Sequence, residues 1–205
     1  MSTNFTPAIL SQSLTWDAYL KLTIEIIETE PKPAIYKDER MLKYTADNLA
    51  RMKKVLEVIN LESKLYNQLN ELKEDWTWVC ITEPWCGDAA QIVPALHVIA
   101  SCSERIQFKI ILRDSNLEIM DKYLTNGGRS IPKLICLKTE TLEEIGTWGP
   151  RPAVIQQIVN ENKDNPNLSF GEKVRMIHSW YETDKTVSLQ KEFIDLIKNW
   201  KDVRL

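Results

Sequence analysis

The stretch at residues 76–91 constrains the fold more than any other part of the sequence. Residues 76–81 are aromatic, apolar or β-branched, which is typical of a strand that is buried on both faces. A proline and a glycine then interrupt the run, and Asp88 suits the first turn of a helix. We therefore expect a strand, a tight loop and a helix, with Cys86 at the helix N-terminus. Unpaired backbone N–H groups at that end favour an anionic sulfur, so Cys86 is a candidate nucleophile.

Several residues in and beyond this stretch form a pattern that is typical of a known protein family. Trp85-Cys86-Gly87 after a hydrophobic strand resembles the redox site of the thioredoxin-like superfamily. Pro94 resembles the proline within its active-site helix, Ile131-Pro132 resembles its cis-proline, and Gly149 resembles its late glycine. The resemblance covers about residues 75–165 and implies an α/β, thioredoxin-like fold with a mixed sheet.

Three longer segments resemble a bacterial thioredoxin-like branch that carries extra helices at both ends. They are Trp-Cys-Gly-Asp-Ala-Ala-Gln at 85–91, Asn-Gly-Gly-Arg-Ser-Ile-Pro-Lys at 126–133 and Gly-Thr-Trp-Gly-Pro-Arg-Pro at 146–152. The resemblance implies that the backbone before Pro132 lies beside Cys86, where an extended substrate can pair with it. The implied site has Cys86 as the catalytic residue, no metal ligand, and for substrate binding Trp85, Gly87, Asp88, Arg129, Ser130, Ile131 and Pro132.

The sequence departs from the thioredoxin pattern at two positions that matter for chemistry. Ala89 replaces the second cysteine of Cys-x-x-Cys, so the site has no resolving thiol to release a mixed disulfide. Cys80 replaces the buried acid that thioredoxins place six residues before the first catalytic cysteine. A single thiol completes only the first half of disulfide exchange without an external helper.

Two opposing charges are expected to set the reactivity of Cys86. The helix terminus favours the thiolate by ~0.3–1 kcal/mol, whereas the Asp88 carboxylate disfavours it. We therefore expect an accessible thiol with modest activation. Arg129 is interpreted as an anion ligand, as a cation that stabilises the thiolate, or as an ordinary surface arginine. Neither His97, roughly 16 Å along the helix, nor the sequence-distant His178 is predicted to act as a base.

The other cysteines are not expected to share this chemistry. Cys80 and Cys136 lie in strand-like runs, where a thiol usually serves as a small buried hydrophobe. Cys102 ends the helix that Cys86 begins, and a rise of ~1.5 Å per residue separates the two by roughly 24 Å, beyond disulfide reach. The cysteine number and spacing predict neither a disulfide scaffold nor a zinc site.

Charge and hydropathy narrow the classes of partner. A formal net charge of −3 over 205 residues gives no electrostatic basis for binding nucleic acid or an anionic membrane. No stretch approaches the roughly 18 uninterrupted apolar residues of a membrane helix, and the N-terminus lacks the pattern of a signal peptide. We expect a cytoplasmic protein whose partners are neither nucleic acids nor membranes.

Hydrophobic periodicity predicts the remaining elements. Helices are expected over 15–28, from 38 for about six turns, and over 62–73, 88–102, 115–124 and 153–162, with two more around 170–181 and 189–200. Strands are expected at 76–81, 106–112, 132–137 and 143–148. From 75 to 165 the order is β-α-β-α-β-β-α, which is the thioredoxin order without its first strand. That strand is expected to be missing or hidden in the N-terminal segment.

The chain is predicted to form one globular unit in three parts. Residues 1–74 are an N-terminal helical extension, residues 75–165 are the thioredoxin-like core, and residues 166–205 are a C-terminal helical extension. The two C-terminal helical patterns carry apolar stripes that must be covered in a folded protein. We expect them to pack on the N-terminal helices.

Four functions agree with these residues. The first is a single-thiol oxidoreductase that forms mixed disulfides with protein or small-molecule thiols and disulfides, without a resident cofactor but with an external thiol such as glutathione. The second is a thioredoxin-fold module that binds peptides or proteins without turnover. The third is a glutathione-dependent iron–sulfur carrier, and the fourth is a peroxidase. The sequence does not predict an oligomeric state.

Overall fold

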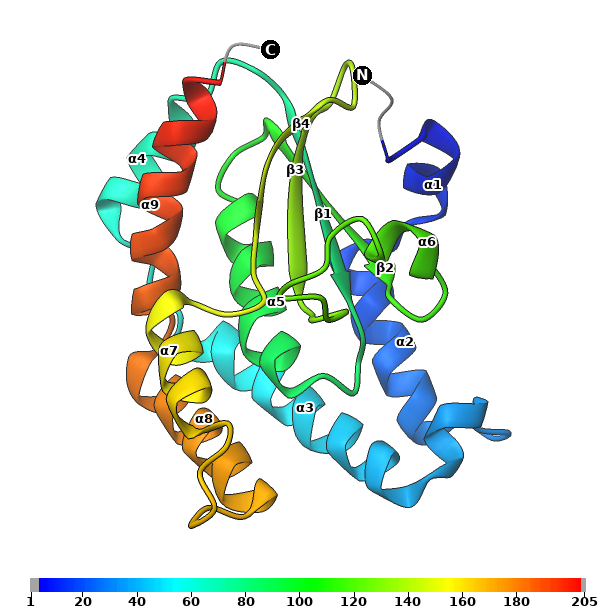
Figure 1. The fold of residues 1–205 in the computed structure, drawn as a ribbon. Coiled ribbons are helices and arrows are strands. Elements are labelled where there is room, and N and C mark those ends of the chain that lie inside the picture. The colour runs from blue at the N-terminus through cyan, green and yellow to red at the C-terminus, as the bar shows by residue number, and fades with distance from the viewer. Residues whose placement is uncertain (1–3, 204–205) are drawn as a thin grey trace.

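The first third of the chain forms helices whose ends are set by capping side chains. In the computed structural model, which describes residues 4–203, Thr15 accepts a hydrogen bond from the Ala18 N–H and Asp38 accepts one from the Arg40 N–H. The predicted helices that begin at these two caps are confirmed. This part contains α1 (Pro7–Gln12), α2 (Trp16–Glu28), the 3₁₀ helix η1 (Ala34–Lys37), α3 (Glu39–Val58) and α4 (Ser63–Asn70) (Figure 1). Periodicity does not reveal α1 or η1, because six and four residues are too few to show it.

Four strands form one mixed sheet at the centre of the molecule. They are β1 (Trp76–Thr82), β2 (Ile106–Leu112), β3 (Lys133–Lys138) and β4 (Glu144–Trp148), in the order β2-β1-β3-β4. β1 pairs in parallel with β2 and antiparallel with β3, and β3 pairs antiparallel with β4. Every residue of β1 is buried, as its apolar run predicts, because the strand has a partner on each side.

A single antiparallel bridge connects the N-terminal segment to the edge strand β2. The backbone of Leu14 exchanges hydrogen bonds of 2.8 and 2.9 Å with the backbone of Ile110 in β2. Leu14 lies in the short link between α1 and α2, where too little chain is extended to form a strand. Between residue 4 and β1 the structure has this bridge and no strand, which agrees with the expectation that the first thioredoxin strand is missing or hidden in the N-terminal segment.

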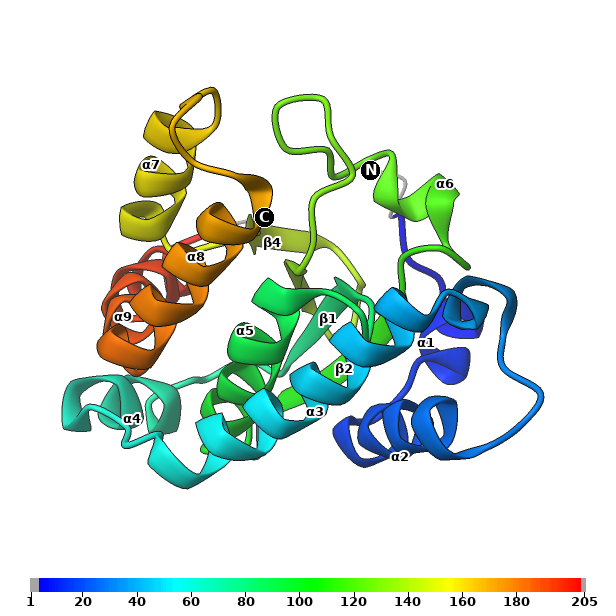
Figure 2. The same cartoon turned by 90° about the horizontal axis from the view of Figure 1, so that it is seen from below.

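Helices cover the sheet in layers. α5 (Gly87–Ala100) connects β1 to β2 and packs on both strands, α3 packs on α5, and α2 contacts α3 and β2 (Figure 2). The short helix α6 (Leu117–Met120) follows β2. The sequence predicts that this helix continues to Leu124. That boundary is wrong, because the chain turns back after Met120 and Thr125 exchanges backbone hydrogen bonds with Gly128.

Three helices complete the chain: α7 (Ala153–Asn162), α8 (Phe170–Asp184) and α9 (Val187–Lys201). α9 packs against α4, which agrees with the prediction that the C-terminal stripes cover N-terminal helices. The prediction is incomplete, because α9 also covers the sheet. The ring of Phe193 lies 5.4 Å from the rings of both Trp78 and Trp148, and the ring of Trp200 lies 6.2 Å from that of Trp78.

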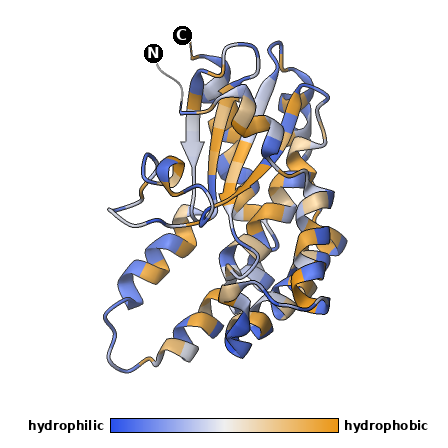
Figure 3. Ribbon diagram, turned by 90° about the vertical axis from the view of Figure 1, so that its right-hand side faces the viewer, coloured by the Kyte–Doolittle hydropathy of each residue, from blue (hydrophilic) through white to orange (hydrophobic). Residues whose placement is uncertain are grey.

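The buried apolar side chains form one core to which the N-terminal helices, the sheet and the C-terminal helices all contribute. Figure 3 shows that the central strands are among the most hydrophobic segments. Within residues 4–203, no helix is long and apolar enough to cross a membrane. The division into residues 1–74, 75–165 and 166–205 stays a prediction, and the extreme ends of the two extensions, 1–3 and 204–205, lie outside the described residues.

Candidate functional site

The sheet register brings Cys86 beside the segment that precedes β3. Ile81 near the end of β1 pairs with Lys133 at the start of antiparallel β3, so the loop that leaves β1 lies next to the loop that enters β3. Cys86 occupies the N-cap position of α5, and its Sγ donates a hydrogen bond of 3.4 Å to the carbonyl oxygen of Ile131. The Ile131–Pro132 peptide bond is cis. The structure therefore brings Cys86 and Ile131 into direct contact.

The Cys86 thiol is buried, and this corrects the expectation of an accessible, modestly activated group. Only 8% of the residue is exposed. Burial and then the Asp88 carboxylate raise the pKa of Cys86 to about 12, although the N–H groups of Ala89 and Asp88 and the Arg151 guanidinium oppose the increase. Desolvation outweighs the helix terminus, so the resting thiol is protonated at neutral pH.

Asp88 is the centre of a polar cluster that joins three segments. The Arg151 guanidinium donates to both of its carboxylate oxygens, at 2.8 and 2.6 Å, and the Tyr181 hydroxyl donates to Oδ1 at 2.9 Å. Arg151 comes from the loop before α7, and Tyr181 comes from α8. Burial and the Asp88 carboxylate raise the pKa of Tyr181 well above its usual value, so the phenol remains a proton donor. The negative charge beside Cys86 is thereby balanced by a cation.

His178 also reaches this site, which corrects its interpretation as a remote residue. A β-carbon added to Gly87 would lie 3.1 Å from Cε1 of His178, so the imidazole packs directly on the residue that follows Cys86. Burial and then the Arg51 guanidinium lower the pKa of His178, which favours the neutral ring. Its Nδ1 is buried and has no hydrogen-bond partner among residues 4–203. α8 thus covers the N-terminus of α5.

Arg129 does not provide the cation beside Cys86 in this structure. Its guanidinium makes two hydrogen bonds, of 2.7 and 2.9 Å, with the exposed carboxylate of Asp121. Ser130 is half-buried in the same loop. Arg113 lies 4.7 Å from the Trp85 ring and donates to the carbonyl of Arg129, so it ties the loop before α5 to the loop before β3.

A buried acid, Glu83, lies in the loop between β1 and α5. Glu83 is 5% exposed, and its Oε1 accepts a 2.8 Å hydrogen bond from the Asp114 N–H. Burial raises the pKa of Glu83 to about 7, and the nearby Asp114 carboxylate acts in the same direction. The Glu83 carbonyl accepts the Cys86 N–H at 3.1 Å, which closes the turn. Glu83 thus contributes its backbone to the turn that positions Cys86 and its side chain to the contact with Asp114.

The other cysteines lie apart from this cluster. Cys80 and Cys136 are fully buried in β1 and β3, as predicted. Cys102 is partly exposed after α5, where its Sγ donates to the Val98 carbonyl at 3.3 Å. His97 stacks on Trp16 with ring centroids 5.1 Å apart, so it serves the packing of α2 on α5. Residues 4–203 contain no group of three or more His, Cys, Asp or Glu side chains placed to hold a metal ion.

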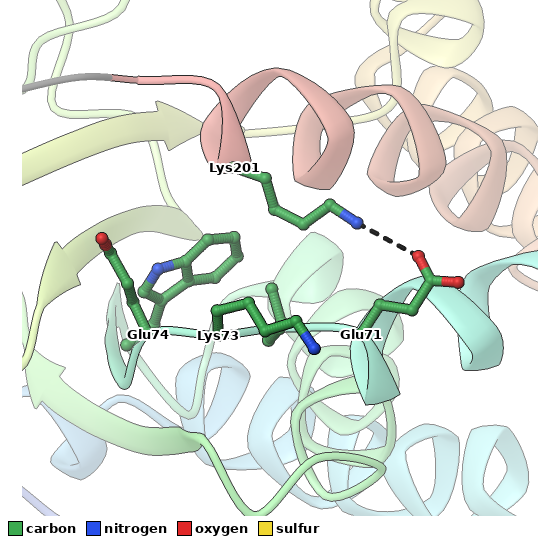
Figure 4. A pocket seen from close by; sticks show the side chains of 6 residues that line it. Glu71, Lys73, Glu74 and Lys201 are labelled. Carbon is green, nitrogen blue, oxygen red and sulfur yellow. Dashed lines mark hydrogen bonds and ion pairs between the residues drawn. The ribbon is translucent and has the colours of Figure 1, made fainter.

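A cavity of ≈ 400 Å³ lies at the opposite end of β1, beside Trp76 (Figure 4). Two of its charged side chains, Glu71 and Lys201, form an ion pair at 3.4 Å, which Figure 4 marks with a dashed line. Glu74 pairs with Lys138 at the same distance. These groups are satisfied by one another and are separated from Cys86 by the length of the strand. The cavity is therefore not part of the candidate site.

Sequence reasoning missed Arg151, His178 and Tyr181. Arg151 lies within the segment at 146–152 that resembles the thioredoxin-like branch, so the motif contained a signal for it. Tyr181 belongs to an apolar stripe of α8, and such a stripe predicts packing in the core and gives no sign of a hydrogen bond to Asp88. For His178 the sequence contains no local signal, because its partner segment lies far away along the chain.

Comparison with known structures agrees with this architecture. The structure of a protein of unknown function from Pseudomonas aeruginosa matches with a TM-score of 0.61 and 16% identity, over 97% of this chain and 98% of that one. An HIV epitope-scaffold matches with a TM-score of 0.58 and 16% identity, over 95% of this chain and 98% of that one. At these identities the likeness concerns the fold alone.

A family model extends the comparison to the sequence. No functionally curated protein matches the chain. The model described as thioredoxin matches residues 34–165, which include α3, the whole sheet, Cys86 and Ile131–Pro132. The match covers more than half of the chain and agrees with the mixed sheet and the position of α5. The chain therefore belongs to the thioredoxin family.

Proposed function

We propose that this protein acts through one thiol, Cys86, by forming a mixed disulfide with a protein or small-molecule disulfide. The observation that supports the proposal is the contact of 3.4 Å between Cys86 Sγ and the Ile131 carbonyl oxygen. It places a cysteine at a helix N-terminus against a backbone segment that an extended substrate can pair with. Trp85, Gly87 and Asp88 on one side, and Arg129, Ser130 and Pro132 on the other, are the proposed substrate-binding residues.

The exchange begins with loss of the Cys86 proton. The thiolate attacks one sulfur of the substrate disulfide, the substrate S–S bond breaks, and the other half leaves as a thiolate that takes up a proton. Positive electrostatic potential from Arg151 and from the N–H groups of Asp88 and Ala89 favours the attacking thiolate. Ala89 supplies no second sulfur, so an external thiol such as glutathione must release the product.

Burial of Cys86 favours a second function, in which the site binds an extended peptide or protein without redox turnover. Because burial raises the pKa of Cys86 to about 12, very little of the thiol is ionised at neutral pH. Reaction by the first route is therefore expected to be slow. The two functions differ in a single observable, which is whether Cys86 forms a covalent adduct in the folded protein.

Intact-mass analysis after exposure of the folded protein to oxidised glutathione tests the proposal. We expect uptake of one glutathione, which is abolished by Cys86→Ser. The matched control is Cys102→Ser, because Cys102 is the more exposed thiol but lies outside the site. The glutathione adduct on Cys86 should still form in the Cys102→Ser variant. If the folded protein takes up glutathione only at Cys102, or not at all, the thiol mechanism is wrong and the binding function takes its place.

A further inference from the structure

A second cavity, of ≈ 220 Å³, lies between α3, α5 and the C-terminal end of α8. Its floor is apolar, with Val55 and Val58 of α3 and the ring of Tyr181. This volume equals roughly seven waters at ~30 Å³ each, so the cavity is too large for a single bridging water and suits a small organic molecule. It is distinct from the cluster around Cys86, although Tyr181 contributes to both.

Two polar side chains that line this cavity have few or no hydrogen-bond partners in the described chain. Gln91 is 9% exposed, and its side-chain amide makes no hydrogen bond within residues 4–203. Arg51 is half-buried, and its guanidinium donates only to the amide oxygen of Asn48, at 2.8 Å, without a carboxylate partner in the described chain. The polar groups of a nearly buried residue are usually satisfied, so the free Gln91 amide points to a ligand, and Arg51 is a cation at the same cavity that such a ligand can use.

The rim adds charge of both signs. Lys185 and Thr186 adopt left-handed conformations with φ of 48° and 70°, which turn the chain between α8 and α9 at the mouth of the cavity. Lys185 is exposed and has no ion pair among residues 4–203, whereas the cation of Lys54 already pairs with Glu57 at 3.1 Å. Glu182 is an exposed acid on the same rim. The unpaired cations Arg51 and Lys185 thus outnumber the unpaired anion.

We propose that this cavity binds a small aliphatic carboxylate, whose carboxylate lies between Arg51 and Gln91 and whose alkyl chain lies on Val55 and Val58. A guanidinium binds a carboxylate through short, charge-assisted hydrogen bonds, and the amide of Gln91 donates to the second oxygen. The aliphatic chain suits the apolar side chains that line the cavity, and the volume of ≈ 220 Å³ accommodates a short chain.

Titration of the full-length, ¹⁵N-labelled protein with hexanoate, followed by NMR, tests this site. We expect saturable shifts of the Gln91 side-chain amide and of the Val55 and Val58 backbone amides, and no saturable shifts with the uncharged isostere hexanamide. Arg51→Gln should weaken binding by about tenfold or more, because a charge-assisted hydrogen bond is lost. Lys53→Gln is the matched control, since it removes one exposed positive charge from the same helix outside the cavity.

Hexanoate binding can be tested separately from the thiol mechanism, because the same titration can be carried out with the Cys86→Ser variant. We expect this variant to bind hexanoate as the wild type does. Shifts that do not saturate, equal binding of hexanamide, or equal weakening by Arg51→Gln and Lys53→Gln would each overturn the proposed carboxylate site. A folded Gln91→Leu variant gives a second check. It should retain the shifts of Val55 and Val58 but require a higher hexanoate concentration to reach them.

Discussion

The Asp88 carboxylate is bound on both oxygens by the Arg151 guanidinium, at 2.8 and 2.6 Å, two residues after Cys86. The two side chains are only 11% and 21% exposed, so water screens the pair weakly. This pair connects the first turn of α5 to the loop before α7, and Tyr181 adds a third hydrogen bond from α8. The electrostatic potential at the Cys86 sulfur therefore depends on residues that are distant in sequence.

Removing the charge of Asp88 and removing the charge of Arg151 should shift the pKa of Cys86 in opposite directions. Asp88→Asn removes the negative charge that raises the pKa of Cys86, so its pKa should fall and its alkylation at a given pH should accelerate. Arg151→Gln leaves that charge unbalanced and should raise the pKa and slow alkylation. The measurement is the pH dependence of the alkylation rate at Cys86. If the pair only holds the structure together, both variants should expose Cys86 more and both should be alkylated faster.

Arg151→Gln should also destabilise the fold by roughly 3 kcal/mol, because it leaves a largely buried carboxylate unpaired. Urea unfolding measures this loss. The double variant Asp88→Asn/Arg151→Gln should recover part of it, since no uncompensated charge remains. A loss in Arg151→Gln without recovery in the double variant would contradict an unpaired Asp88 charge as its cause.

Tyr181→Phe tests whether α8 shields the site. The variant removes one hydrogen bond to a carboxylate and should cost about 1.5–3 kcal/mol, with faster alkylation of Cys86 as α8 separates from α5. Tyr66→Phe, on the exposed face of α4, is the control and should change neither quantity. An unchanged alkylation rate in a destabilised Tyr181→Phe protein would show that α8 does not limit access.

Glu83 should make stability depend on pH. Burial raises its pKa from 4.5 to about 7, so between these values the folded state holds a proton that the unfolded state has released. Stability contributed by the protonated acid is complete below about pH 4.5 and is lost as pH rises through 7, by up to about 3 kcal/mol. Urea unfolding across this window should show the loss in the wild type. Glu83→Gln, which keeps an acceptor for the Asp114 N–H, should lack that component.

Gly146→Ala should be strongly destabilising. A β-carbon on Gly146 in β4 would overlap the indole of Trp200, so α9 must move away from the sheet. Overpacking of this kind typically costs about 1–3 kcal/mol, which thermal or urea unfolding can measure. Gly171→Ala is the control, because its β-carbon would have only ordinary van der Waals contact within α8. Equal stability of the two variants would contradict the close packing of α9 on β4.

Ala89→Cys should restore the ability to form an internal disulfide. Residue 89 lies one turn after Cys86 on the same side of α5, and it is fully buried beside the site. After mild oxidation, Cys86 should resist alkylation until a reductant is added. Ala95→Cys is the buried control, because position 95 lies roughly 13 Å along the helix from Cys86, and this variant should leave Cys86 unprotected. An oxidised Ala89→Cys protein that cannot reduce any disulfide would argue against the oxidoreductase function.

Local patterns in the sequence predict much of the fold and the position of Cys86. The apolar run of β1 indicates burial on both faces, and Thr15 and Asp38 mark the starts of α2 and α3 because their side chains satisfy nearby N–H groups. The sequence at Cys86 likewise predicts the start of α5. These features depend on residues a few positions apart, which is why they can be recognised without a structure.

Only the tertiary structure decides the environment of the sulfur. Burial of Cys86 reverses the modest activation expected from a helix terminus, since desolvation depends on every segment that surrounds the thiol. Arg151, His178 and Tyr181 reach the site because the loop before α7 and the helix α8 lie against the start of α5, a contact between segments more than sixty positions apart. The sequence by itself determines which elements form and which residue carries the thiol, whereas long-range packing determines its charge state and access.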